Sequence, residues 1–368
     1  MVAERLPAEP VIVEHSLGSY PVYVEAGALV WLPDLLSELL PGRRVCLIAD
    51  ARVHELYRTG QLGAAPWKGE TLTFEPGEGS KTRETWARLT DFLMERGFGR
   101  DSGVIALGGG VAGDLAGFVA ATYMRGIPYV QVPTTLLAML DASVGGKTGV
   151  DTPRGKNLVG AFHPPNAVLA DPRTLASLSE REYRGGLAEA VKHGLIADEA
   201  YFAWMEQSTV ALLGRDLTAL THLIRRSVEI KGEVVAGDER EAGRRAILNA
   251  GHTVAHALEQ ASAYRIPHGE AVALGLIVEC YLAEGLGIAP AGLQERVAGL
   301  LASLALPTHM PFSLDPASLL DVMGTDKKNR DGQIRFALAS GLGQMHRERE
   351  WTTRVSSDLV RAALAAIN

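Results

Sequence analysis

The chain has 368 residues, a length typical of two domains, and its 47% hydrophobic and 21% charged residues are ordinary for a globular protein. The net charge of −7 argues against nucleic acid as a partner, and no apolar run is long enough to span a bilayer. Residues 1–16 show no basic start followed by an apolar core, so we expect no signal peptide. Only Cys46 and Cys280 are present, far apart, which favours a reducing, cytoplasmic location.

The first half of the chain alternates strand-like and helix-like segments. Residues 11–30 alternate apolar and polar side chains, as short strands do. Further strands are predicted from short apolar runs, and helices from apolar residues at helical spacing. The predicted strands cover 44–50, 103–108, 129–133 and 167–171, and the predicted helices cover 82–96 and 111–123. This alternation predicts an α/β domain with a parallel sheet.

Beyond Asp171 the apolar spacing becomes helical. Helices are predicted at 186–196, 217–235, 246–263, 271–286 and 293–304, with one late hairpin formed by 334–338 and 344–347 around Gly341. We therefore expect an α/β domain over residues 1–178 and a mostly α-helical domain over 179–368.

A glycine-rich segment, Gly108-Gly-Gly-Val-Ala-Gly113, lies between a predicted strand and a predicted helix. Such a loop lets the backbone approach a pyrophosphate at a helix N-terminus. No acid follows about twenty residues later to hold a ribose, as the usual fingerprint requires. We interpret the segment as a variant dinucleotide-binding loop, with Asp50 as a candidate for the ribose; the alternative is a tight turn without a ligand. Gly146-Lys-Thr148 is not a P-loop, because Asp141 stands where that motif needs its first glycine.

Three histidines fall within seventeen residues. His252 and His256 are four apart, so they share a helix face, and His268 starts the next apolar run. Three protein ligands with one open position are typical of catalytic zinc. Each histidine could instead be an ordinary polar group near a core, unless a further donor lies nearby. Glu189 is such a donor if its apolar helix is buried; the alternative is a surface pair with Lys192.

A set of basic residues accompanies these motifs. If the set converges on one pocket, it indicates a substrate with more than one negative charge, for which phosphate and carboxylate are the natural pair. The set comprises Lys147, Lys156, Lys192, Lys231, Arg245, Lys327 and Lys328.

The motifs together resemble those of the 3-dehydroquinate synthase family, over nearly the whole chain. The resemblance is densest in Gly108–Phe118, Pro133–Leu137, Asp141–Gly149, Gly155–Asn157, Leu187–Lys192, Asn249–Glu259 and His268–Glu270. Small departures from the family pattern occur at Met139, Ala142, Asp151 and His163.

The resemblance implies roles for particular residues. The metal ligands would be Glu189, His252 and His268, holding zinc or else cobalt, and the catalytic group would comprise His256, Lys147, Lys192, Arg245 and Asn249. NAD would contact Asp50, Glu78, Lys81, Gly109, Gly110, Val111, Asp114, Thr134, Thr135, Lys147 and Lys156. The substrate would contact Arg125, Asp141, Lys147, Asn157, Lys192, Lys231, Arg245, Asn249 and one of Lys327 and Lys328.

The implied reaction converts 3-deoxy-D-arabino-heptulosonate 7-phosphate to 3-dehydroquinate and phosphate. It combines transient oxidation by NAD, phosphate elimination, reduction and an intramolecular aldol closure, so the net change is that of a lyase. This would place the enzyme in the shikimate pathway of aromatic amino-acid biosynthesis. Alternatives are another sugar-phosphate cyclase, a metal-dependent polyol dehydrogenase and a non-catalytic binding protein of this fold. We also expect a homodimer.

Overall fold

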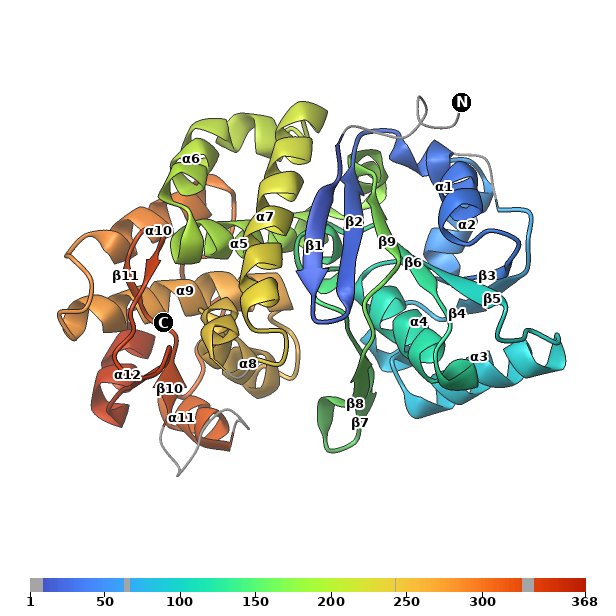
Figure 1. The fold of residues 1–368 in the computed structure, drawn as a ribbon. Coiled ribbons are helices and arrows are strands. Elements are labelled where there is room, and N and C mark those ends of the chain that lie inside the picture. Colours follow the sequence, from blue (N-terminus) through green and yellow to red (C-terminus); the bar gives the residue numbers. More distant parts are fainter. Residues whose placement is uncertain (1–8, 63–66, 242, 326–333) are drawn as a thin grey trace. The chain divides into compact units, whose positions relative to one another are not determined.

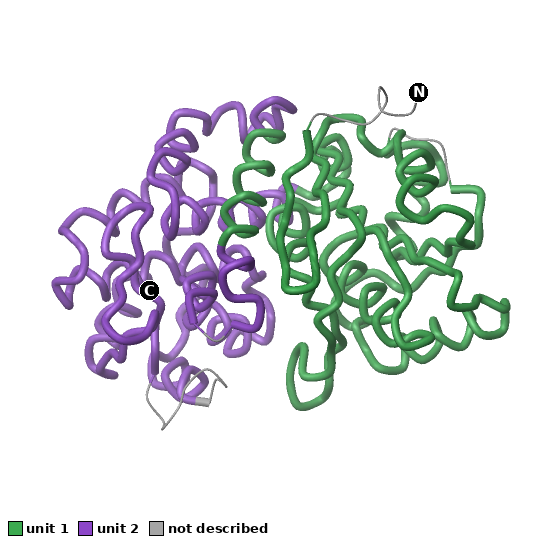
Figure 2. The backbone as a smooth tube through the Cα atoms, viewed as in Figure 1, with its two compact units in different colours: residues 1–179, 220–233 green, residues 180–219, 234–368 purple. Residues whose placement is uncertain are grey.

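The computed structural model describes residues 9–62, 67–241, 243–325 and 334–368, which form two compact units (Figure 2). Unit 1 comprises Met1–Ser179 and Leu220–Glu233, and unit 2 comprises Glu180–Ala219 and Val234–Asn368. The long helix α7, Leu217–Gly237, therefore contributes its middle to unit 1 and its two ends to unit 2. The predicted domain boundary at residue 178 stays a prediction.

Unit 1 is built on a seven-stranded sheet with the order β1-β2-β9-β6-β5-β3-β4 (Figure 1). All neighbouring strands are parallel except the first pair, in which Val13 lies opposite Tyr20 of the antiparallel partner. The α/β class with a parallel-rich sheet is thus confirmed. The strands are β1 Val11–His15, β2 Gly18–Val24, β3 Arg44–Asp50, β4 Thr71–Phe74, β5 Ser102–Gly108, β6 Tyr129–Pro133 and β9 Ala167–Ala170.

Helices cover both faces of this sheet. In β3, Cys46 and Ile48 join a core cluster with residues of α3 and α4, whereas Leu47 and Ala49 join a second cluster with residues of α1 and α2. Successive strand side chains point to opposite faces, so a strand covered on both sides reads as a continuous apolar run. The helices are α1 Leu32–Leu39, α2 Ala51–Arg58, α3 Arg83–Glu95 and α4 Gly110–Thr122, and short helices lie at Ala28–Trp31, Glu78–Ser80, Tyr123–Arg125, Ala138–Ala142 and Pro172–Ser177.

An antiparallel hairpin that was not predicted from the sequence follows β6 along the chain. Its strands are β7, Lys147–Thr152, and β8, Gly155–Phe162, with Lys147 opposite Phe162. The glycines, lysines and polar residues of this segment hide the strand period, and β8 is largely exposed, so no apolar alternation marks it.

Unit 2 is mostly helical, as predicted. Its helix α9, His268–Gly285, is buried on all sides, with Val272, Leu274, Leu276 and Ile277 almost inaccessible. A helix that is apolar all round is typical of the interior of a helical domain. The other helices are α5 Glu180–Ala197, α6 Glu199–Leu213, α8 His252–Ala261, α10 Leu293–Ser303, α11 Pro316–Thr325 and α12 Ser357–Ala365.

Two sequence-based elements of unit 2 are wrong in detail. The continuous helix predicted over 246–263 is interrupted, because Arg244–Asn249 forms a 3-10 helix and Gly251, with φ of 80°, breaks the chain before α8. The late hairpin pairs β11, Ala339–Gly341, with β12, Gln344–Met345, whereas β10, Arg335–Phe336, pairs with β13, Thr353–Arg354.

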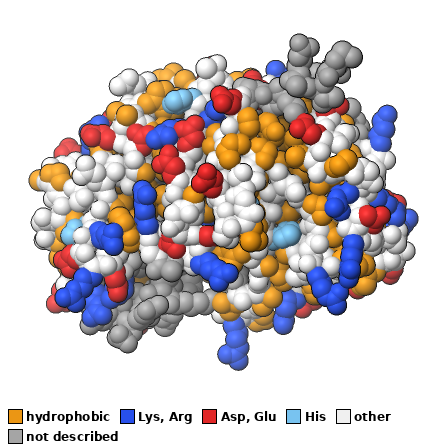
Figure 3. Space-filling view, in the orientation of Figure 1, with side chains coloured by type: hydrophobic (Ala, Val, Ile, Leu, Met, Phe, Trp, Pro, Cys, Tyr) orange, Lys and Arg blue, Asp and Glu red, His pale blue; other side chains and the backbone are white. Residues whose placement is uncertain are grey.

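None of the described helices is long and apolar enough to cross a lipid bilayer. On the face drawn in Figure 3, acidic and basic side chains are interspersed among the described residues.

Candidate active site

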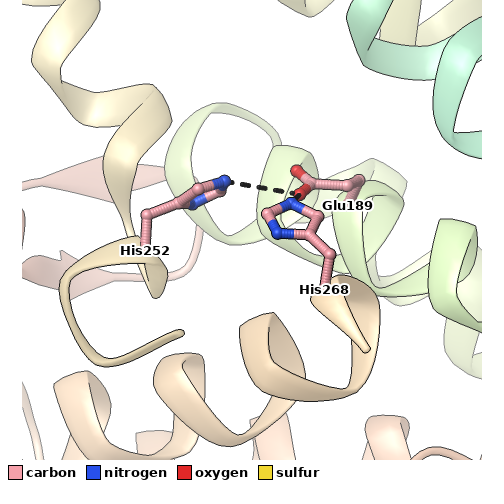
Figure 4. Close-up of side chains that lie close together, drawn as sticks. All are labelled: Glu189, His252 and His268. Atoms are coloured by element: carbon pink, nitrogen blue, oxygen red, sulfur yellow. Dashed lines mark ion pairs between the residues drawn. The ribbon is translucent and has the colours of Figure 1, made fainter. Parts of the chain in front are cut away.

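Glu189, His252 and His268, here called the triad, point toward one another from three helices of unit 2 (Figure 4). Glu189 lies in the middle of α5, whereas each histidine is the first residue of its helix, α8 or α9. The Oε1 atom of Glu189 lies 3.5 Å from Nε2 of His252 and 3.4 Å from Nε2 of His268. One carboxylate oxygen therefore faces both imidazoles.

These separations suit a shared divalent metal. Ligand atoms bonded to tetrahedral zinc at 2.0–2.2 Å lie about 3.3–3.6 Å from one another. The Glu189 carboxylate is fully buried and, among the residues that the structure describes, accepts no hydrogen bond of good geometry. One carboxylate and two imidazoles are a donor set that zinc commonly takes. The residues present thus fit a metal ion.

Lys192 adds a positive charge to the triad. It follows Glu189 by one helical turn on α5, is 1% exposed, and its Nζ forms an ion pair with Glu189 Oε2. Burial raises the pKa of Glu189, but Lys192 and the two histidines outweigh burial and hold that pKa well below its usual range. The Glu189 side chain is therefore an anionic donor, and the surface Glu–Lys pair considered as an alternative is excluded by the burial of both partners.

Glycine pairs bring the three helix backbones close enough for the triad to meet. A Cβ atom built on Gly269 would lie 2.2 Å from the carbonyl oxygen of Gly185, and one built on Gly275 would lie 2.0 Å from that of Gly251. Only glycine permits such backbone contacts. Each pair includes a residue adjacent to a triad histidine, so the same contacts fix the helix ends that carry the imidazoles.

His256 lies beside the triad without belonging to it. It stands one turn beyond His252 on α8, and the two rings meet edge to face with centroids 5.7 Å apart. This position agrees with the predicted helix face but leaves the acid/base role a prediction.

The segment before α8 places Arg245 and Asn249. The carboxylate of Asp238 accepts hydrogen bonds from the backbone N–H groups of Gly243 and Arg245, at 2.7 and 2.9 Å. Arg245 is 2% exposed and donates to the backbone carbonyl of Glu239. Arg245 and Asn249 lie in the 3-10 helix before Gly251, so they do not stand on the same helix as His252 and His256.

Glu241 is a residue that the sequence analysis missed. Its carboxylate accepts a hydrogen bond of 2.8 Å from Asn249 Nδ2. Glu241 lies in an irregular segment with φ of 58°, so no helical spacing relates it to Asn249. The contact between Glu241 and Asn249 therefore becomes visible only in the folded structure.

In unit 1, the predicted nucleotide-binding residues gather near the carboxyl ends of neighbouring strands. The glycine-rich loop joins β5 to α4, and Thr134, after β6, donates its backbone N–H to Gly108. A Cβ on Gly109 would lie 3.0 Å from Thr135 Cγ2, and one on Gly108 would lie 3.3 Å from Asp50 Oδ2. Asp50 also accepts from Val53 N at 2.7 Å and so caps α2. Open sheets bind ligands at this edge.

Two ion pairs lie among the predicted NAD contacts. Lys81 is 4% exposed, and its Nζ lies 2.5 Å from Oδ2 of Asp114; Lys156 Nζ lies 3.8 Å from Oε1 of Glu78. Burial raises the pKa of Asp114, and the Lys81 ammonium opposes that rise. Four of the predicted NAD contacts thus form two ion pairs.

The predicted substrate contacts of unit 1 divide into one ion pair, between a buried lysine and a half-buried aspartate, and three exposed residues. Lys231 Nζ lies 2.8 Å from Asp141 Oδ1, and the lysine is 6% exposed. Arg125, Lys147 and Asn157 are exposed, and Arg125 and Asn157 both have positive φ values, of 68° and 54°. Lys327 and Lys328 lie outside the described residues.

Comparison with known proteins decides the family. The model of the 3-dehydroquinate synthase N-terminal domain matches residues 71–185, and that of the C-terminal domain matches residues 186–329. A 3-dehydroquinate synthase of Halorhodospira halophila is 48% identical over 332 residues, covering 90% of this chain and 93% of the relative.

The chain belongs to the 3-dehydroquinate synthase family.

Two solved structures are similar to this family member over almost its whole length. A 2-deoxy-scyllo-inosose synthase complexed with carbaglucose-6-phosphate, NAD+ and Co2+ superposes with a TM-score of 0.87 at 26% identity, covering 96% of this chain and 99% of that one. A 2-epi-5-epi-valiolone synthase from Streptomyces hygroscopicus with NAD+ and Zn2+ bound gives 0.83 at 29% identity, covering 98% and 99%.

The close contact at Gly269 predicts that adding one methyl group there lowers the stability of the protein. Gly269→Ala should destabilise the protein by about 1–3 kcal/mol, because the new Cβ would overlap the α5 backbone. It should also weaken metal binding, since His268 must move with its helix end. Gly299→Ala on α10 is the matched control, because nothing lies within 4 Å of its new Cβ. Thermal unfolding and a metal titration of both variants check this; a Gly269→Ala protein as stable as the control contradicts it.

Proposed function

We propose that this family member is a 3-dehydroquinate synthase that converts 3-deoxy-D-arabino-heptulosonate 7-phosphate to 3-dehydroquinate and phosphate. The net reaction would eliminate phosphate without net oxidation, which makes it a lyase reaction. The observation that carries the proposal is the triad, built around the buried Glu189 with Lys192 beside it, in a chain about half identical to named synthases. The corresponding pathway is the shikimate route to aromatic amino acids.

The triad would hold the metal, with zinc as the first choice and cobalt as the second. NAD would be held by the glycine-rich loop, with Lys81, Asp114 and the threonines after β6 around it. When bound, NAD accepts and returns a hydride while the metal polarises the oxygen of the reacting carbon. The full set of proposed NAD contacts is Asp50, Glu78, Lys81, Gly109, Gly110, Val111, Asp114, Thr134, Thr135, Lys147 and Lys156.

The protein's own side chains would bind the anionic substrate and move protons. Arg245 offers a planar, two-pronged partner for the carboxylate, and the lysines offer compact charges for the phosphate. His256 would exchange a proton with the substrate, because a neutral imidazole is suited to that role near neutral pH. The proposed substrate contacts are Arg125, Asp141, Lys147, Asn157, Lys192, Lys231, Arg245, Asn249 and one of Lys327 and Lys328.

The competing activities are another sugar-phosphate cyclase and a polyol dehydrogenase. We expect the protein, incubated with the heptulosonate phosphate, NAD and zinc, to release phosphate continuously with no accumulation of NADH. Mass spectrometry and proton NMR should identify the carbocycle as 3-dehydroquinate. Build-up of NADH in proportion to substrate would instead indicate a dehydrogenase. Glucose 6-phosphate and sedoheptulose 7-phosphate, tested in parallel, would reveal a different cyclase.

The proposal includes a homodimer in the cytoplasm. Both cysteines are buried and free, which is compatible with a reducing compartment. Light scattering in solution measures the oligomeric state directly.

A further inference from the structure

The Nδ1 atoms of the two triad histidines have different hydrogen-bond partners. Nδ1 of His252 lies 3.1 Å from the backbone carbonyl oxygen of Ala250, whereas Nδ1 of His268 lies 3.4 Å from Oε2 of Glu259. Both partners are acceptors, so in each ring the proton belongs on Nδ1 and the lone pair on Nε2. In each ring, Nε2 is the atom that faces Glu189.

A locally built turn brings Glu259 to His268. Glu259 lies in the last turns of α8, and its backbone carbonyl accepts from Ser262 Oγ and from Tyr264 N. Ala263 and Tyr264 have φ values of 50° and 60°, a left-handed conformation that non-glycine residues seldom adopt. The turn reverses the chain so that the end of α8 faces the start of α9.

Glu259 carries its carboxylate in a place where negative charge is costly. It is 7% exposed, and burial of a charge without a partner is costly. It also lies near the C-terminus of α8, where the helix dipole disfavours negative charge. A hydrogen bond from the Nδ1–H of His268 to this carboxylate relieves both penalties.

We propose that Glu259 is a positioning residue for the metal centre: its carboxylate holds the Nδ1–H of His268 and thereby fixes the tautomer and ring orientation that present Nε2 to the metal. The proposal rests on the metal site proposed above. A carboxylate in this place also makes the imidazole a stronger metal ligand, because it stabilises positive charge on the ring. His252 needs no such side chain, since the carbonyl of Ala250 performs the same task.

Two substitutions separate the negative charge of Glu259 from its capacity to accept a hydrogen bond. Glu259→Gln keeps an acceptor oxygen but removes the charge, and Glu259→Met fills similar space and removes both. Glu284→Gln is the control: Glu284 lies toward the other end of α9, where its carboxylate accepts from Gln294 N at 2.7 Å. The metal-free proteins are titrated with Zn2+ against a chromophoric chelator, and Co2+ spectra report the geometry of the site.

Loss of a carboxylate behind a metal-bound histidine weakens metal binding by roughly 10- to 100-fold. We expect Glu259→Met to show a loss in this range with an altered Co2+ spectrum, Glu259→Gln a smaller loss, and Glu284→Gln the Kd of the parent. Unchanged Kd values in both Glu259 variants would overturn the proposal, as would an equal loss in Glu284→Gln. If Glu259→Met does not fold, the comparison of Glu259→Gln with the control decides. If the parent itself binds no metal, the triad assignment fails instead.

Discussion

His268→Ala should abolish stoichiometric metal binding and, with it, turnover. The variant removes one of three donors whose ligand atoms all lie within 4.8 Å of one another. Metal catalysis of this kind contributes several kcal/mol, so we expect kcat to fall by about 100- to 10,000-fold. Metal analysis of the purified variant, together with phosphate release, measures both effects.

His256→Ala is the matched control for this experiment. It removes an imidazole one helical turn from His252 on α8, but His256 is not among the donors that converge with Glu189. We expect this variant to lose activity while keeping the metal content of the parent. A His268→Ala protein that keeps stoichiometric metal would show the triad to be wrong, and loss of metal from His256→Ala would show that His256 is a ligand.

Most strands of the unit 1 sheet, and the helices α3 and α4, could be predicted because burial gives them continuous or periodic apolar patterns. The runs at 44–50, 103–108 and 129–133 lie in the middle of the sheet, where both faces are covered. The strand at Thr71–Phe74 was missed, since it is an edge strand of four residues whose exposure alternates. The hairpin at 147–162 was missed because its chain carries charges and glycines on an exposed strand.

The triad could be proposed before the structure was known because the resemblance to the family singles out Glu189, His252 and His268. The residues alone indicated only three clustered histidines and an acid in an apolar helix. Contacts made through turns are not visible in this way. Gly251 breaks the expected helix through a backbone angle, and the contacts Glu241–Asn249 and Glu259–His268 depend on left-handed residues that no period predicts.

The assignment of residues 220–233 to unit 1 illustrates a second limit. The helix α7 is continuous in sequence and in backbone, so its apolar spacing predicts one element and no boundary. The middle segment of α7, which carries Lys231, packs against unit 1. At Gly232, for example, a Cβ atom would lie 3.4 Å from Val13 Cγ2 of β1. Which unit a helical side chain serves depends on packing partners distant in sequence, here a strand more than two hundred residues earlier.

Arg245→Lys should raise the KM for the carboxylated substrate strongly while leaving metal binding intact. Arg245 is almost fully buried, and its backbone N–H is fixed by Asp238, so the guanidinium has a defined place. Lysine keeps the charge but loses the fork that binds a carboxylate with two hydrogen bonds. Hydrogen bonds to charged groups contribute about 1.5–3 kcal/mol each, which corresponds to roughly a 10- to 150-fold rise in KM for one lost bond.

Arg244→Lys provides the control for this last substitution, because Arg244 is the preceding residue of the same 3-10 helix but is exposed. It should show the KM of the parent. Steady-state phosphate release with the heptulosonate phosphate and with sedoheptulose 7-phosphate, which lacks the carboxylate, separates two possibilities. If Arg245 binds the carboxylate, the variant Arg245→Lys should prefer the keto acid over sedoheptulose 7-phosphate by a smaller factor than the parent does. An equal loss for both substrates would mean that Arg245 binds a group they share, and a parent that cyclises both equally well would favour a different cyclase.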